Sequence, residues 1–338
     1  AMNASRIAGP LIAGALIASA GNVYVFVLNA VLSLLSGVLL IRWRRAHQPS
    51  PLGRERLLSA IRVGVQFVGQ SAPVRATLLR TVIFYFNSIA MLALLPLLAQ
   101  RLDGPAAGMF TVLLACMGIG AIAGALLLPR MRRYLSRNSL VVAGSLVKAG
   151  GAAVVALGGS LNLAAPAMLL AGVAWITAAN SLAVSVQLAL PDWVRARGMS
   201  IFQMAMMGAS ALGAAVWGQV ASMYSVQASV LAASICGAVT ALATLRMAGG
   251  SGSDADLTPS HEFKVPVAAT TPTAGHVQIT IEYRIDPERA GEFREVMRES
   301  RRSRLQQGAL SWELLRSASD PACYIERIVD ESWTEHLR

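Results

Sequence analysis

Apolar segments of roughly 20 residues make up most of the chain as far as Leu245, and charges or clusters of Gly, Asn, Ser and Pro separate them. A hydrocarbon core about 30 Å thick is crossed by roughly 20 apolar residues in a helix. The pattern therefore predicts eight membrane-spanning helices, at about residues 5–20, 23–41, 81–100, 107–128, 139–159, 163–187, 198–222 and 226–245.

The pattern changes after residue 246. Residues 247–275 are rich in Gly, Ser, Pro and Thr, which predicts a flexible linker. Apolar and polar residues then alternate from His276 to Ile285 with the period of a half-buried strand. Turn and capping residues predict the rest of a small domain: a helix from Asp286 to Gly308, strands at about 310–316 and 323–329, and a further helix that starts at Glu331.

Basic residues occur in alternate connections between the predicted spans. The positive-inside rule places the basic connections in the cytoplasm. We therefore expect a multi-pass protein of a bacterial inner membrane, with both chain ends and the C-terminal domain in the cytoplasm. The other set of connections contains only Arg101, whereas the basic set contains Arg6, Arg42, Arg44, Arg45, Arg54, Arg56, Arg62, Arg75, Arg80, Arg130, Arg132, Arg133, Arg137, Arg195, Arg197 and Arg246.

The composition agrees with a membrane protein, because 55% of the residues are hydrophobic and 14% are charged, against about 25% charged residues in soluble domains. The net charge of +11 follows from the Arg residues of the connections, so nucleic-acid binding is not expected. The three Cys are isolated in the sequence and form no cluster with His. The sequence thus predicts no disulfide framework, no metal site and no cofactor.

The first residues of the chain read Asn3-x-x-Arg6-x-x-Gly9-Pro10-x-x-Ala13-Gly14. This run resembles the fifth-helix antiporter motif of major facilitator exporters, which Arg6, Gly9, Pro10 and Gly14 would represent. Small residues of this kind allow neighbouring helices to approach closely, and Pro bends the helix. Ser5 and Ala13 stand where the family has glycines.

Three further segments are similar to the same superfamily. Gly124 and the run from Pro129 to Arg133 are placed like its basic cytoplasmic loop, with Arg130 and Arg133 as the motif cations. The basic stretch 42–80 resembles the cytoplasmic link between the two six-helix halves. The loop before the eleventh helix is represented by residues 191–199, which include Arg195 and Arg197.

This resemblance implies an all-α polytopic membrane protein with helices five to twelve of a twelve-helix major facilitator fold. The most similar group comprises the bacterial transmembrane secretion effectors related to enterobactin exporters. The first four helices would then be missing, and the chain would be a fragment cut at both ends. The implied parts are the last two helices of the N-terminal half (1–41), the inter-half loop (42–80), the C-terminal half (81–246), the linker (247–275) and a soluble domain (276–338).

The βαββα order predicted for the soluble domain resembles the ferredoxin-like fold of antibiotic-biosynthesis monooxygenases and dimeric α+β barrels, without the closing strand. The resemblance implies a homodimer formed through the sheets. Trp312, Trp333 and His336 leave open a membrane-tethered monooxygenase-like enzyme or a ligand sensor, because some relatives use Trp and His around a haem or an aromatic substrate. A non-transporting membrane scaffold is another alternative. The basic helix face at 298–304 allows contact with anionic lipid.

Polar side chains inside a bilayer are costly and often mark a transport pathway. The resemblance places helices seven and ten against the central cavity. Lys148 lies near the middle of its span, too deep to reach the interface easily. We predict that six residues bind a small amphipathic substrate such as a drug, siderophore or metabolite; helix–helix hydrogen bonding is the alternative, favoured for Ser and Thr. They are Asn87, Ser88, Trp175, Asn180, Gln203 and Lys148.

No Asp or Glu occurs within the eight predicted spans. Proton-coupled carriers usually need a buried carboxylate, so proton antiport is implied by the resemblance alone. The sequence as a whole predicts a secondary active exporter that works by alternating access and is not an enzyme.

Overall fold

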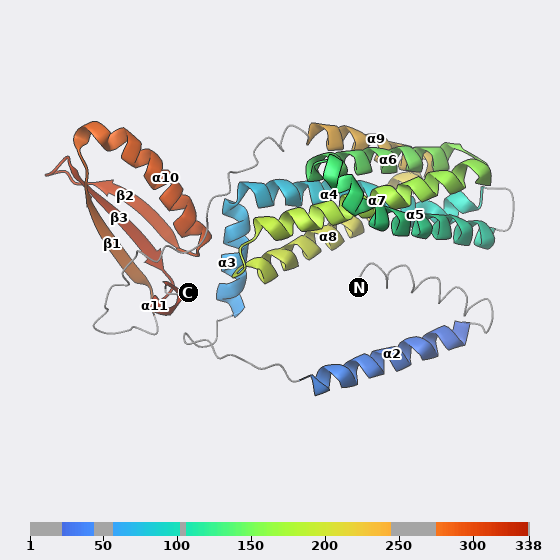
Figure 1. The fold of residues 1–338 in the computed structure, drawn as a ribbon, viewed down its shortest axis with the longest axis horizontal. Helices are drawn as coiled ribbons and strands as arrows, with labels where there is room; N and C mark the ends of the chain where they lie inside the picture. The colour runs from blue at the N-terminus through green and yellow to red at the C-terminus, as the bar shows by residue number, and fades with distance from the viewer. Residues whose placement is uncertain (1–21, 44–56, 102–105, 245–274, 337–338) are drawn as a thin grey trace. The chain divides into compact units, whose positions relative to one another are not determined.

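The computed structural model describes residues 22–43, 57–101, 106–244 and 275–336 (Figure 1). The chain divides into two compact units. The first unit comprises Ala1–Pro49, Val82–Leu182 and Gly208–Arg246, and the second comprises Ser50–Thr81, Ala183–Met207 and Met247–Arg338. Helices α4, α7 and α8 each contribute residues to both units.

Seven helices in the described part of the chain are long and apolar enough to cross a membrane. None of them contains Asp or Glu. The predicted multi-pass helical architecture is thus confirmed, while the predicted span at residues 5–20 lies outside the described residues. The seven helices are α2 (Asn22–Arg42), α4 (Ala72–Ala99), α5 (Ala106–Tyr134), α6 (Arg137–Leu157), α7 (Leu161–Ala189), α8 (Arg195–Met223) and α9 (Val226–Ala243).

Helices α4 and α5 extend furthest beyond the bounds that hydropathy predicts. Helix α4 begins at Ala72 rather than at about residue 81, because backbone hydrogen bonding continues through a turn that carries Arg75. Helix α5 continues through Pro129 to Tyr134, so Arg130 and Arg133 lie on its last turns. The placement of these two cations in a loop was therefore wrong. Proline removes one backbone donor, and here the helix continues past it.

Small residues bring the helices of the first unit into close contact. A Cβ atom added to Gly120 on α5 would lie 1.9 Å from the carbonyl oxygen of Leu169 on α7. A Cβ atom added to Gly172 on α7 would lie 2.1 Å from the carbonyl oxygen of Met117 on α5. Each helix therefore needs a glycine where the backbone of the other crosses it, as is common between membrane helices.

The second unit contains an amphipathic helix, α3 (Leu57–Gln70), within the basic segment 42–80. Its buried residues are Ser59, Val63, Gly64 and Phe67, which recur at the spacing of one helical face. A hydropathy pattern does not identify this helix, because polar residues interrupt the apolar ones. The helix ends at Gln70, and α4 starts two positions later at Ala72.

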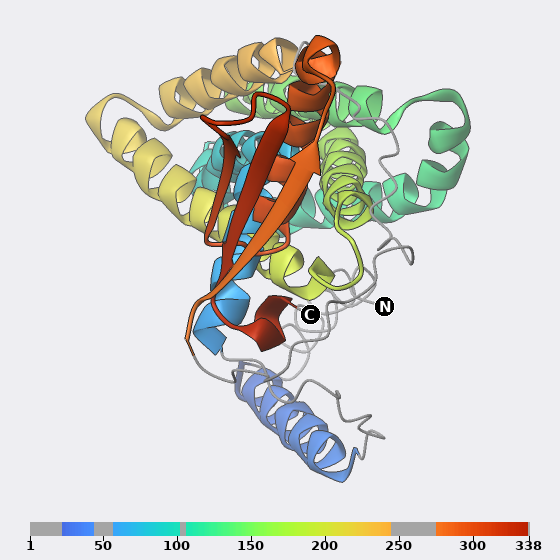
Figure 2. The same cartoon turned by 90° about the vertical axis from the view of Figure 1, so that its left-hand side faces the viewer.

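The C-terminal part of the second unit has the predicted element order. It comprises β1 (Val277–Arg284), the 3₁₀ helix η2 (Pro287–Arg289), α10 (Ala290–Gln306), β2 (Ser311–Arg316), β3 (Cys323–Asp330) and α11 (Trp333–His336). The strands form an antiparallel sheet in the order β1-β3-β2. Helix α10 packs on one face of this sheet (Figure 2). Phe293 on α10 contacts Tyr283 and Tyr324. The last helix starts at Trp333 rather than at Glu331, because Ser332 accepts a hydrogen bond from the Glu335 backbone and caps it.

Candidate functional site

Lys148 places an amino group in the interior of the helical bundle. Its side chain is 2% exposed and lies about 16 Å along α6 from Arg137 at the start of the helix. The Nζ atom has no hydrogen-bond partner among the described residues. It lies 5.1 Å from the centroid of the Trp175 ring on α7, in a cation–π contact. The structure therefore brings two of the predicted substrate-binding residues together.

Two aromatic residues of α4 complete this cluster. The Trp175 ring is perpendicular to the Tyr85 ring, with centroids 5.4 Å apart. Its centroid lies 5.6 Å from that of Phe84, and the rings of Phe84 and Tyr85 also contact each other edge to face. Phe84 and Tyr85 are buried. The site thus combines one amino group with three aromatic rings contributed by helices α4 and α7.

Trp175 offsets only part of the cost of an ammonium group at this depth. A desolvated cation–π contact contributes about 2 kcal/mol. A charged side chain at the centre of a bilayer costs about 2.5–3.5 kcal/mol on insertion scales and about 10 kcal/mol or more in simulations of isolated helices. None of the described spans contains an Asp or Glu that could balance Lys148. An ammonium group at Lys148 would therefore be uncompensated in the described part of the chain, and a buried amino group of this kind is unusual for a packing residue and common at functional sites.

Asn180 lies further along α7 and contacts a cation of another helix. Its Oδ1 atom accepts a hydrogen bond of 2.8 Å from Arg132 Nη2 on α5. The neighbouring Ser181 is fully buried, and its Oγ atom has no hydrogen-bond partner in the described part of the chain. Thr177, in contrast, bonds to the carbonyl oxygen of Val173 in its own helix. Asn180 thus links α7 to the end of α5 that carries the Arg cluster.

The remaining predicted substrate residues are not part of this cluster. Asn87 on α4 packs beside Gly237 on α9. Its Nδ2 atom donates to the carbonyl oxygen of Ile83, while its Oδ1 atom is buried without a partner among the described residues. Ser88 is partly buried on α4, and Gln203 is exposed on α8. The structure does not bring these three residues together with Lys148.

Two of the motif cations, Arg195 and Arg197, lie at the start of α8, whereas Arg130 and Arg133 lie on the last turns of α5. Arg195 forms an ion pair with Asp192 and donates a hydrogen bond of 3.5 Å to the carbonyl oxygen of Leu190. Arg197 packs against α3, where a Cβ atom added to Gly64 would lie 2.9 Å from the Arg197 Cβ atom. The earlier motif residues Arg6, Gly9, Pro10 and Gly14 lie outside the described residues. The predicted role of these cations in conformational change stays a prediction.

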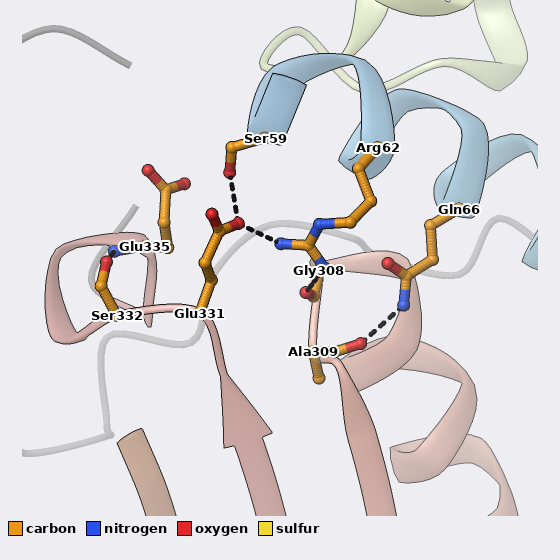
Figure 3. A network of polar contacts seen from close by, with 8 residues as sticks. All are labelled: Ser59, Arg62, Gln66, Gly308, Ala309, Glu331, Ser332 and Glu335. Atoms are coloured by element: carbon orange, nitrogen blue, oxygen red, sulfur yellow. Dashed lines mark hydrogen bonds and ion pairs between the residues drawn. The ribbon is translucent and has the colours of Figure 1, made fainter. Parts of the chain in front are cut away.

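The same helix α3 holds the C-terminal domain by several polar contacts (Figure 3). Arg62 donates to the Glu331 carboxylate at 2.8 Å and to the carbonyl oxygen of Gly308 at 3.2 Å. Ser59 donates to the same oxygen of Glu331 at 3.0 Å. Gln66 donates to the carbonyl oxygen of Ala309 at 2.6 Å. We call this set the α3 contact.

Inside the C-terminal domain, a buried carboxylate occupies the centre of the sheet. Glu326 on β3 has no exposed surface. It accepts hydrogen bonds from Tyr283 at 2.8 Å, Trp312 at 2.6 Å and Ser300 at 3.3 Å, and Arg304 lies 4.0 Å away. Burial and the adjacent carboxylate raise the pKa of Tyr283 to about 12. Because Ser300 and Arg304 belong to α10, their contacts with Glu326 hold this helix against the sheet.

The residues that suggested an enzyme are engaged in similar internal contacts. Trp312 donates to Glu326, as described above. Trp333 stacks on His336 with ring centroids 5.3 Å apart, and His336 Nδ1 lies 2.7 Å from Asp330 Oδ2. Within the described residues, no group of three His, Cys, Asp or Glu side chains is arranged to hold a metal ion.

Reasoning from the sequence missed Phe84, Tyr85 and Arg132 as parts of the site. Phe84 and Tyr85 belong to the aromatic run Phe84-Tyr85-Phe86 just before Asn87, which was the available signal. Arg132 was noted as a topology cation and as part of the run from Pro129 to Arg133, not as a site residue, yet it is the partner of Asn180. A helix end can therefore contribute to a site whose other residues lie within a span.

The seven long apolar helices in the described part of the chain are those of a multi-pass membrane protein. The chain matches the family described as transmembrane secretion effector, over residues 1–338, and belongs to this family of major facilitator proteins. The predicted assignment to a transport family is thereby confirmed. A comparison with curated proteins found no match.

Proposed function

We propose that the protein is a secondary active transporter that exports a small amphipathic molecule across a bacterial inner membrane by alternating access. The observation that carries this proposal is the contact between Lys148 and Trp175, which places a polar group and a large apolar ring side by side near the middle of two spans. Carriers of this kind bind their substrates near the midplane of the membrane. An amphipathic molecule has a polar part that suits the amino group of Lys148 and an apolar part that suits the ring of Trp175.

Membership of a secretion-effector family supports export as the direction of transport. The C-terminal sheet supports a role for this domain that is separate from transport. The strand order β1-β3-β2, with α10 on one face, agrees with three strands of a ferredoxin-like domain. We place this domain in the cytoplasm because the Arg-rich connections precede it on the same side of the membrane. We also propose that the domain forms a homodimer through its sheet and that transport is coupled to proton antiport. Both parts of the proposal rest on family resemblance.

Export is tested in bacterial cells that lack their own broad-range efflux pumps. The full-length protein should lower the steady-state accumulation of fluorescent amphipathic dyes. Trp175→Ala should reduce export of a dye about tenfold, which corresponds to the loss of about 1.4 kcal/mol of interaction, at equal amounts of protein in the membrane. Tyr134→Ala is the control, because Tyr134 is an exposed aromatic residue at the end of α5.

Asn180→Ala and Asn87→Ala extend the test to the other predicted residues. Normal export by Trp175→Ala, Asn180→Ala and Asn87→Ala alike contradicts the assignment of the site. A complete absence of flux from the wild-type protein, for anionic, neutral and cationic amphipathic compounds alike, contradicts transport itself and favours a membrane scaffold.

A further inference from the structure

The Lys148 site also constrains the chemical class of the substrate. Building on the exporter function proposed above, we propose that the substrate is an organic anion with an aromatic ring. Its acidic group pairs with the Lys148 ammonium, and its ring packs against Trp175 and the two aromatic residues of α4.

The charge of the substrate follows from the surroundings of Lys148. The ammonium group has three donors, and none of them has an acceptor among the described residues. A carboxylate or similar acidic group of the substrate supplies both the missing acceptors and the missing negative charge. A cationic substrate is repelled at this depth, where water does not screen the charges, and a neutral substrate leaves the ammonium unbalanced.

The aromatic ring follows from the side chains beside the ammonium. Trp175 contacts Lys148 through its face, and Tyr85 meets Trp175 at an interplanar angle of 85°. Phe84 contacts both Tyr85 and Trp175. Aromatic pairs favour edge-to-face and offset contacts of this kind. A planar ring attached to the acidic group would find aromatic partners of the same kind beside Lys148.

An internal ion pair is the competing explanation, in which a carboxylate outside the described residues balances Lys148. The two explanations predict opposite effects of Lys148→Met on the ligand-free protein. If a substrate supplies the counter-charge, removing the lone ammonium relieves an uncompensated cost, and the melting temperature rises or stays unchanged. If the protein supplies it, Lys148→Met leaves a buried carboxylate without a partner, and the melting temperature falls.

The experiment uses the purified full-length protein in detergent and three compounds with the same ring. These are 2-naphthoate, the neutral 2-naphthamide and the cationic 2-(aminomethyl)naphthalene. Ligand-induced shifts in melting temperature give apparent affinities, and proteoliposomes loaded with each compound give transport rates. We expect 2-naphthoate to bind and to be transported by the wild type in preference to the other two. Lys148→Met should weaken binding of 2-naphthoate about tenfold or more, since a charge-assisted pair is lost, and Lys148→Arg should retain most of it.

Several results overturn the inference. If the wild type prefers the amide or the amine, the anionic substrate is ruled out while the exporter function stands. The same holds if the Lys148→Met variant binds 2-naphthoate as well as the wild type does. A fall in the melting temperature of ligand-free Lys148→Met shows an internal ion pair instead. Absence of flux for all three compounds and for the dyes overturns the exporter function together with this inference.

Discussion

Arg62 on α3 and Glu331, which directly follows β3, form an ion pair of 2.8 Å across a separation of 269 residues in the sequence. Both side chains are about one-third exposed, and an exposed pair of this kind contributes about 0–1 kcal/mol. The pair is one of several bonds in the α3 contact, which also uses the carbonyl oxygens of Gly308 and Ala309. The C-terminal domain is therefore held by many weak bonds rather than by one strong bond.

Arg62→Ala removes two bonds of the α3 contact at once. We expect faster hydrogen exchange in α3 and around residues 308–310 of the full-length protein, with unchanged exchange in α5 and α7. The double variant Arg62→Glu with Glu331→Arg should recover part of the protection, because it reverses the pair without removing it. Unchanged exchange in Arg62→Ala means that this pair does not hold the domain in solution.

Gly120→Ala tests the close approach of α5 and α7. The new Cβ atom would lie 1.9 Å from the carbonyl oxygen of Leu169, so the two helices have to separate. We expect a loss of stability of about 2 kcal/mol or more, measured as a lower melting temperature in detergent. Gly118→Ala is the matched control on the same helix, because a Cβ atom there meets nothing within 4 Å. Equal melting temperatures for the two variants contradict the packing described for α5.

Tyr283 makes the stability of the C-terminal domain sensitive to alkaline pH. Its pKa of about 12 in the folded protein is above the ordinary value of 10.0. The hydrogen bond to Glu326 is therefore fully stabilising below pH 10, and its contribution is lost as the pH rises from 10 to 12. A difference titration of tyrosinate absorbance between the wild type and Tyr283→Phe should show one tyrosine that ionises near pH 12. Ionisation of that residue near pH 10 contradicts the buried contact.

Gly308→Ala tests the turn between α10 and β2. Gly308 has a φ of +110°, a conformation that costs a residue with a Cβ atom about 1–3 kcal/mol. The added Cβ atom would also lie 2.9 Å from a methyl group of Val63 on α3. We expect a lower melting temperature and weaker protection of α3 in hydrogen exchange. Gly291→Ala, at an open position in α10, should be neutral or stabilising by up to about 1 kcal/mol.

The elements that the sequence predicts best are those whose periodicity is tied to a buried face. The strand predicted at 276–285 is β1, and those predicted at 310–316 and 323–329 agree closely with β2 and β3. Alternation of apolar and polar residues fixes the register of a strand, because a shift by one residue would turn its apolar side chains away from the core. Helix α3 was harder to predict, since its packing partners include Trp193, which is distant in the sequence and contacts Phe67.

For the candidate site, the sequence predicted Lys148 and Trp175 as participants, but neither the aromatic residues of α4 nor the contact between the two. Lys148 is conspicuous because it is a cation in an apolar span, and Trp175 because it is an aromatic residue in a span expected to line the cavity. Their contact depends on how closely α6 packs against α7. That approach is possible because Gly144 meets the backbone of Ala174, and Gly151 meets that of Ala167. Glycines of this kind are frequent in all membrane helices, so spacing alone does not reveal which ones touch.

Helix α3 has two adjacent contact faces. On one, Phe67 meets the Trp193 ring edge to face with centroids 5.6 Å apart, and Gly64 meets Arg197 near the start of α8. On the other, Ser59, Arg62 and Gln66 bond to the C-terminal domain. A rotation of α3 about its axis that releases Glu331 also withdraws Phe67 from Trp193. Helix α3 thus joins the C-terminal domain to the start of α8 through a single element, so a change at either contact is expected to alter the other.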